Sequence, residues 1–124
     1  QLKKNLHYII QKISEDKKNK MHSMKQSKHI FVDIDETICR YVDERHYPHA
    51  IPIQENIDKI NKLYDEGHHI KYWTARGYVT GLDWYEVTEN QLKKWGCKYH
   101  ELSVGEKPAY DLLICDKTMR IEEI

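Results

Sequence analysis

HIFVDIDET, residues 29–37, is the stretch that decides how the rest of the chain is interpreted. His29–Ile34 is a short apolar run of strand type, and the segment ends in the acidic residues Asp33 and Asp35. Two carboxylates at a strand end repel each other unless a cation offsets their charge, so the segment indicates a site for a divalent ion. A strand that runs into an acidic surface turn has the same pattern, and the segment alone does not decide between the two.

Predicted helices and strands alternate downstream of this segment. The helices are expected over 53–64 and 84–95, and the strands over 70–73, 98–102 and 112–115. Strands separated by helices of this length predict an α/β fold, a Rossmann-like parallel sheet flanked by helices. Ligands of such sheets bind beyond the carboxyl ends of the strands. Asp33, Thr74 and Asp116 each follow or end a predicted strand, so they are expected at one edge.

Residues 1–27 are expected to form an N-terminal helix and a basic linker ahead of a domain over 28–124. Leucines and isoleucines recur at helical spacing over 2–14 and predict an amphipathic helix, whose apolar side needs a neighbouring domain, a second subunit or the body as partner. The segment 15–28 has almost no apolar residue and is expected to be a solvated linker. Residues 1–28 hold eight Lys against Glu15 and Asp16. Contact with a polyanion is one interpretation, and a solvated arm is preferred because no Arg accompanies the lysines.

Cysteine and hydropathy patterns exclude several classes of protein. Cys39, Cys97 and Cys115 match no zinc-binding spacing, and unpaired thiols favour a cytoplasmic location. No run of about 18 apolar residues is present, so neither membrane insertion nor secretion is expected. His68 and His69 begin a predicted strand away from the acidic edge and are expected at the surface.

Four motifs in order resemble the haloacid dehalogenase (HAD) superfamily of phosphatases. FVDIDET (31–37) resembles motif I, in which the first Asp is phosphorylated and the second transfers a proton. Thr74 in YWTARG (72–77) resembles motif II, whose hydroxyl holds the phosphoryl group. Lys107 in GEKP (105–108) resembles the cation of motif III, and Asp116 after LLIC (112–115) the metal-binding acid of motif IV. The resemblance covers about residues 28–120.

The resemblance implies a hydrolase that acts on phosphomonoesters with Mg²⁺. Asp33 would be the nucleophile and a metal ligand, Asp35 the acid–base and a metal ligand through its backbone carbonyl, and Asp116 the remaining ligand. Thr74 and Lys107 would share the charge of the phosphoryl oxygens. Relatives end the last strand in Asp-Asp, and Cys115 replaces the first of that pair. This departure puts metal affinity or turnover in doubt.

Motif spacing implies a capless member of the superfamily. Forty residues separate Asp33 from Thr74 and 32 separate Thr74 from Lys107, which leaves room for a flap over 38–51 but not for a cap domain. The candidates for substrate binding are Thr37, Arg40 and Arg76, and a solvent-facing loop position is the alternative for each.

The local pattern around residues 74–108 resembles small HAD proteins of capsular-polysaccharide and surface-sugar biosynthesis, so a small sugar phosphate is the expected substrate. A nucleotide or nucleic-acid-end phosphatase is one alternative. A catalytically weak regulatory or scaffolding domain is another, motivated by Cys115 and the basic helix. Membrane partners are not expected, nucleic acid is disfavoured, and the N-terminal helix is the candidate contact to another subunit or domain.

Overall fold

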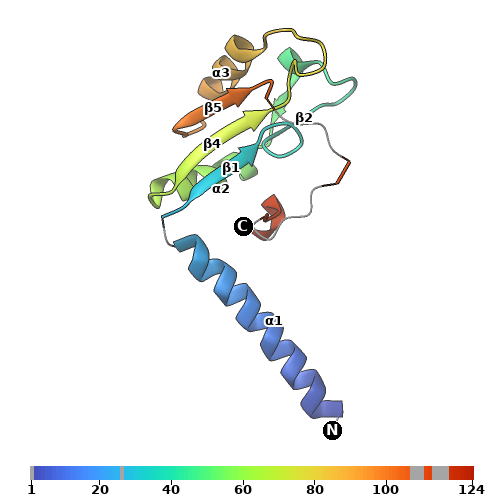
Figure 1. Ribbon diagram of the computed structural model, residues 1–124, viewed down its shortest axis with the longest axis vertical. Coiled ribbons are helices and arrows are strands. Elements are labelled where there is room, and N and C mark those ends of the chain that lie inside the picture. Colours follow the sequence, from blue (N-terminus) through green and yellow to red (C-terminus); the bar gives the residue numbers. More distant parts are fainter. Residues whose placement is uncertain (1, 26, 107–110, 113–117) are drawn as a thin grey trace.

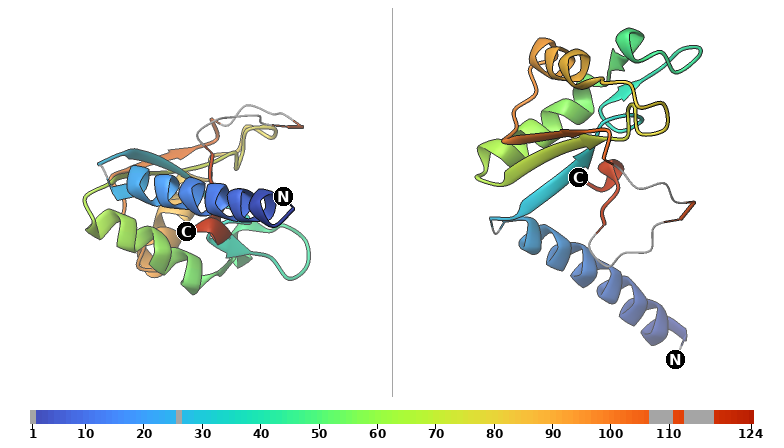
Figure 2. Two further views of the ribbon diagram at one scale, coloured as in Figure 1. Left: turned by 90° about the horizontal axis from the view of Figure 1, so that it is seen from below. Right: turned by 45° about the horizontal axis from the view of Figure 1, so that its top comes forward.

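A computed structural model describes residues 2–25, 27–106, 111–112 and 118–124. Its central sheet has three parallel strands in the order β1-β4-β5 (Figure 1). They are β1 (His29–Asp33), β4 (His69–Thr74) and β5 (Glu101–Val104). The helices α2 (Gln54–Asp65) and α3 (Tyr85–Lys94) connect them and cover one face of the sheet (Figure 2). The expected α/β architecture with a parallel sheet and flanking helices is confirmed at this level.

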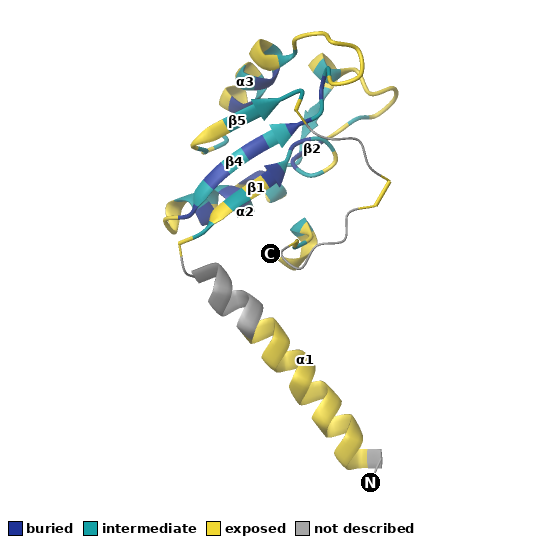
Figure 3. Ribbon diagram, viewed as in Figure 1, coloured by how far each residue is buried: buried dark blue, intermediate teal, exposed yellow. Residues whose placement is uncertain are grey.

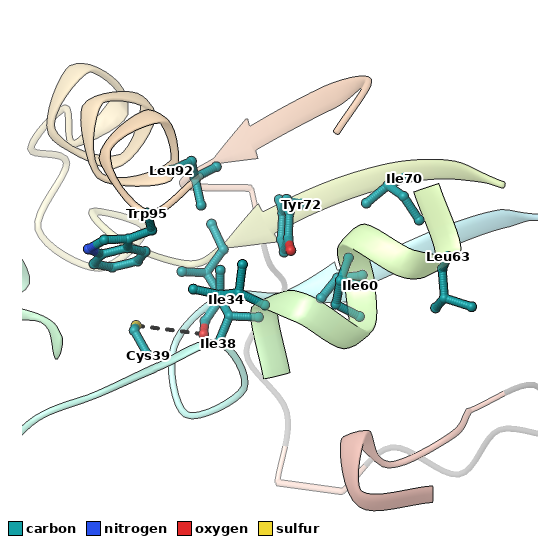
Figure 4. Close-up of a cluster of buried hydrophobic side chains, with 11 residues drawn as sticks. Ile34, Ile38, Cys39, Ile60, Leu63, Ile70, Tyr72, Leu92 and Trp95 are labelled. Atoms are coloured by element: carbon teal, nitrogen blue, oxygen red, sulfur yellow. Dashed lines mark hydrogen bonds between the residues drawn. The ribbon is translucent and has the colours of Figure 1, made fainter. Parts of the chain in front are cut away.

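The hydrophobic core lies between the sheet and these two helices (Figure 4). Alternate residues of β4, namely Ile70, Tyr72 and Thr74, are buried, because successive side chains of a strand point to opposite faces. The helix α2 supplies Ile57, Ile60 and Leu63 at helical spacing. Further core residues come from the segment after β1 and from the C-terminal part of α3: Ile34, Ile38, Cys39, Leu92 and Trp95. On the other face of the sheet Phe31 is 63% exposed.

The segment between β1 and α2 forms a small flap. It contains the antiparallel pair β2 (Cys39–Arg40) and β3 (Ile51–Pro52) and a short 3-10 helix, η1 (Tyr47–His49). The segment expected as a flap over 38–51 therefore has regular structure only in these short elements. Ile38 and Cys39 are fully buried, so the core holds the base of the flap in place.

The N-terminal helix is longer than predicted. The helix α1 (Leu2–Lys25) includes the helix expected over 2–14 and continues where a linker was expected, so the linker prediction is wrong. Lys, Glu and Met are good helix formers even where no apolar face exists, which explains the extension. α1 points away from the sheet, and Leu6, Ile9, Ile10 and Ile13 are 52–60% exposed (Figure 3).

Histidines line the amino ends of the three strands. The imidazole rings of His29 and His69 stack at 4.5 Å between centroids, and those of His69 and His100 at 4.4 Å. His69 Nε2 lies 2.7 Å from the Glu101 carboxylate. His68 is buried, which contradicts the expected surface position, because its Nδ1 accepts a hydrogen bond from the Lys28 backbone that enters β1.

The C-terminal strands differ from the sequence prediction in two places. The strand expected over 98–102 begins three residues later, at Glu101. The strand expected over 112–115 does not include Leu112, which is 73% exposed, and residues 113–115 lie outside the described residues. In the part of the chain that the structure describes, no helix has the length and apolar character needed to cross a membrane.

Candidate functional site

The carboxyl ends of β1 and β4 lie side by side and bring the predicted acidic segment next to Thr74. Asp33 pairs in register with Trp73, and the Ile34 amide donates to the Trp73 carbonyl at 3.1 Å. The chain then turns sharply, since the amide of Ile38 donates back to the Ile34 carbonyl at 3.0 Å. Asp33 and Asp35 are both half-buried at this turn. The prediction that the strand ends converge is therefore confirmed for β1 and β4.

Asp35 is the centre of a dense hydrogen-bond network. Its carboxylate accepts a hydrogen bond from the Thr74 hydroxyl at 2.9 Å and one from the Tyr41 hydroxyl at 2.5 Å. The Arg76 guanidinium donates to it through Nη2 at 2.9 Å and through Nε at 3.2 Å. The Asp35 side chain is 10% exposed and that of Arg76 is fully buried. Three donors from β4, the following loop and the flap thus fix one carboxylate.

Arg76 is held by α3 as well as by Asp35. Its Nη1 donates to the Thr88 hydroxyl at 3.0 Å and to the Gln91 side-chain oxygen at 2.6 Å. The guanidinium also lies over the Tyr47 ring, 5.0 Å from its centroid. Arg76 had been predicted as a substrate-binding residue, and its described donors are directed at protein groups instead.

The protonation state of Asp35 follows from these contacts. Burial raises the pKa of its carboxyl, but the hydrogen bonds from Arg76, Tyr41 and Thr74 and the Arg76 charge outweigh burial and hold that pKa below its usual value. Burial, followed by the hydrogen bond to Asp35, raises the pKa of the Tyr41 hydroxyl. Burial raises the pKa of the Cys39 thiol to about 12. At neutral pH the cluster therefore contains one carboxylate, one guanidinium, a neutral phenol and a neutral thiol.

The other residues predicted for the site are found in the turn after β1, on β2 or outside the described residues. Thr37 is half-buried in the turn after β1, and its carbonyl accepts a hydrogen bond from Asn56 at 2.8 Å. Arg40 is exposed on β2. Lys107 and Asp116, as well as Cys115, lie outside the described residues.

Tyr41 contacts Asp35 directly, although no sequence pattern distinguishes it from the other aromatic residues of the flap. The one available signal in the sequence is the two-residue spacing between Cys39 and Tyr41. Cys39 and Tyr41 are two residues apart on an extended segment, so they lie on the same side, and both contact Asp35.

The described donors fit an oxygen-coordinated cation such as Mg²⁺. The Asp33 carboxylate and the Asp35 backbone carbonyl are at one turn, and hard cations take oxygen ligands. The neighbouring Cys39 thiol stays protonated, so it does not favour a soft metal. Among the described residues, which exclude Asp116, no group of three His, Cys, Asp or Glu side chains is assembled.

Glu36 has a strained backbone between Asp35 and Thr37. Its φ of 65° lies in the left-handed region, which non-glycine residues rarely adopt. Its carboxylate accepts a hydrogen bond from Arg45 of the flap at 2.9 Å. Strain of this kind persists where surrounding contacts hold it, and it is concentrated at functional sites.

The fold and the site together define an α/β protein with an acidic, hydrogen-bonded centre at the carboxyl ends of two parallel strands. A crystal structure of a structural-genomics target from Vibrio cholerae superimposes with a TM-score of 0.68 over 77% of this chain and 85% of that chain, at 24% identity. This likeness shows the fold. No protein-family model matches the sequence, and no curated protein matches it.

Proposed function

We propose that the protein is a magnesium-dependent phosphomonoester hydrolase of the capless HAD type, with Asp33 as nucleophile. The observation that supports this proposal is the contact of Asp35 with the Thr74 hydroxyl at 2.9 Å, at the edge where Asp33 ends β1. In this proposal Asp35 is the acid–base group and Thr74 the hydroxyl donor at the edge of the sheet where Asp33 ends β1, and transfer of a phosphoryl group to an Asp uses such a set.

Each described residue has a chemical task in this reaction. The Asp33 carboxylate attacks phosphorus, and the bond from phosphorus to the leaving oxygen breaks, so that the phosphoryl group is carried by Asp33. Asp35 gives a proton to the leaving alkoxide and later takes one from the water that hydrolyses the aspartyl-phosphate. The Thr74 hydroxyl donates to the Asp35 carboxylate, and in this proposal it would donate to a phosphoryl oxygen when the substrate is bound. Bound Mg²⁺ would offset the negative charge shared by the nucleophile and the phosphate.

The residues proposed to hold Mg²⁺ are Asp33 through its carboxylate, Asp35 through its backbone carbonyl and Asp116. Lys107 is proposed to offset the remaining phosphoryl charge. The latter two assignments rest on the motif resemblance alone.

The lowered pKa of Asp35 suits the second half of the reaction, in which this carboxylate accepts a proton. The first half needs the protonated acid. A phosphate dianion next to Asp35 raises the pKa of its carboxyl by repulsion between like charges, so substrate binding itself would favour uptake of the proton. Arg76 and Tyr41 then act as positioning residues that hold the carboxyl in place in both states.

We further propose that the substrate is a small sugar phosphate of surface-glycan synthesis and that the reaction takes place in the cytoplasm. The absence of room for a cap between the motifs supports an open site, and the likeness to surface-sugar HAD proteins supports the sugar. A nucleotide or nucleic-acid end is the competing substrate, and a regulatory domain without turnover is the competing class.

The decisive experiment is a screen of phosphomonoesters with and without Mg²⁺. Hydrolysis is expected only with the metal, and Asp33→Asn should abolish it, because the amide neither attacks phosphorus nor offers an anionic metal ligand. Asp58→Asn, on the exposed side of α2, is the matched control and should keep wild-type rates. Multiple turnover by Asp33→Asn, or no hydrolysis of any compound by the wild-type protein, would refute the proposal.

A further inference from the structure

A cavity of about 290 Å³ opens beside the turn that follows Thr74. It is lined by Arg45 and Tyr47 of the flap and by the loop 75–84 that leads into α3. Ala75, which directly follows Thr74, is part of its wall. Ligand pockets for drug-sized molecules span roughly 300–1,000 Å³, so this cavity suits a group the size of a single ring.

The wall of the cavity is mainly apolar. Tyr47 and Trp84 meet edge to face with centroids 5.1 Å apart, and Val79 and Leu82 add aliphatic surface. Gly77 lets the loop close over them. Its φ is +85°, and a Cβ there would collide with the Leu82 carbonyl oxygen. Aromatic faces of this kind pack against the apolar face of a ring.

Arg45 alone is charged among the described residues that line the cavity. Its side chain is half-exposed and pairs with Glu36 in the turn between Asp35 and Thr37. An exposed ion pair of this kind contributes little and exchanges readily, so the guanidinium is available to a stronger anionic partner. The ion pair with Glu36 therefore keeps Arg45 at the rim of the cavity, beside the turn that contains Asp35.

We propose that this cavity binds the leaving group of the substrate and that Arg45 recognises a second negative charge on it. The inference rests on the proposed phosphohydrolase function and narrows its substrate. The ligand is a phosphomonoester whose leaving group has an apolar ring face, packed on Tyr47 and Trp84, and an anionic substituent. A sugar acid and a nucleoside with a second phosphate both have this chemistry.

The kinetic test compares four substrates: glucuronic acid phosphate, adenosine bisphosphate, glucose phosphate and para-nitrophenyl phosphate. Arg45→Gln should lower kcat/KM by about tenfold or more for one of the two substrates with a second charge, since a hydrogen bond to a charged group is lost. It should leave kcat/KM within about twofold for glucose phosphate and para-nitrophenyl phosphate, which have no second anionic group. Lys93→Gln, an exposed cation of α3, is the control and should change none. The substrate that responds identifies the source of the charge.

An equal effect of Arg45→Gln on all hydrolysed substrates, or no effect on any, would overturn the inference while the phosphatase proposal stands. If the wild-type protein hydrolyses none of the substrates, the phosphatase proposal fails, and the inference is then tested by ligand binding alone. Glucuronic acid phosphate or adenosine bisphosphate should then still change the tryptophan fluorescence, the change should be lost in Trp84→Phe, and the Kd should rise about tenfold in Arg45→Gln. Fluorescence that does not respond, or the same response in both variants, overturns the inference.

Discussion

Replacing Arg76 by Met should destabilise the protein strongly, because it removes one partner of a buried ion pair. The Arg76 side chain is fully buried and that of Asp35 is 10% exposed, so water does not replace the lost donors. Breaking such a pair from one side costs about 3–5 kcal/mol. Folded domains have a free energy of unfolding of about 5–15 kcal/mol in total, so the variant should retain only a small part of it. The expected fall in Tm is about 10 °C or more.

The stability lost in Arg76→Met should depend on pH in a defined direction. The folded-state pKa of Asp35 lies below its usual value, so the pair adds stability above about pH 4 and loses it as the pH falls through the folded pKa. In Arg76→Met the carboxyl stays buried without its cation, and burial then raises its pKa. The variant should therefore come closer to the wild-type protein as the pH falls from 7 toward 4, because a protonated Asp35 needs no cation.

Urea unfolding of Arg76→Met, Asp35→Asn and the double variant, followed by circular dichroism, measures these effects. The double variant should be less destabilised than the sum of the single variants, as expected for residues in direct contact. Arg45→Met is the matched control, because its ion pair with Glu36 is exposed and contributes about 0–1 kcal/mol. A loss below about 1 kcal/mol in Arg76→Met, or a loss that does not vary with pH, would refute the role given to Arg76.

Three further substitutions test the turns and the hydroxyl of the site. Gly77→Ala should lower the free energy of unfolding in urea more than Gly81→Ala does. Both glycines have a positive φ, but only at Gly77 would a Cβ collide with the Leu82 carbonyl, so equal losses would contradict this reasoning. Thr74→Val should lower the free energy of unfolding by about 1–3 kcal/mol and remove most of the activity, because the hydroxyl donates to a buried carboxylate. Thr74→Ser, which retains a hydroxyl, should keep the stability and the activity of the wild-type protein. Glu36→Gly should be about 1 kcal/mol more stable than Glu36→Ala, because only glycine adopts φ 65° without strain, and the reverse order would show that the turn is unstrained.

Much of the sheet was predictable because parallel strands place their carboxyl ends together. The apolar periodicity of α2 and the apolar run ending at Asp33 predict a helix that packs against a parallel strand, and the structure has Asp35 in contact with Thr74 at the carboxyl ends of β1 and β4. The substrate role predicted for Arg76 depended on its place in a loop, and loop residues usually face solvent. Nothing in the sequence reveals that this loop turns the guanidinium inward onto Gln91.

The length of α1 and the start of β5 were mispredicted for related reasons. A polar segment such as 15–25 carries no apolar period, so its helix depends on intrinsic propensity, which periodicity analysis does not detect. β5 begins at Glu101 because Lys71 of β4 pairs with it, and strand register is a tertiary property. The strand predicted over 113–115 stays a prediction.

The junction between α1 and β1 determines what can be attached to this protein without blocking it. α1 leads into the amino end of β1, beside the histidine stack, whereas Asp33 is at the other end of that five-residue strand (Figure 1). At about 3.3 Å per residue step the two ends are roughly 13 Å apart. A scaffold, resin or fused protein joined at the junction of α1 and β1 would therefore be attached at the end of the strand that lies opposite to Asp33.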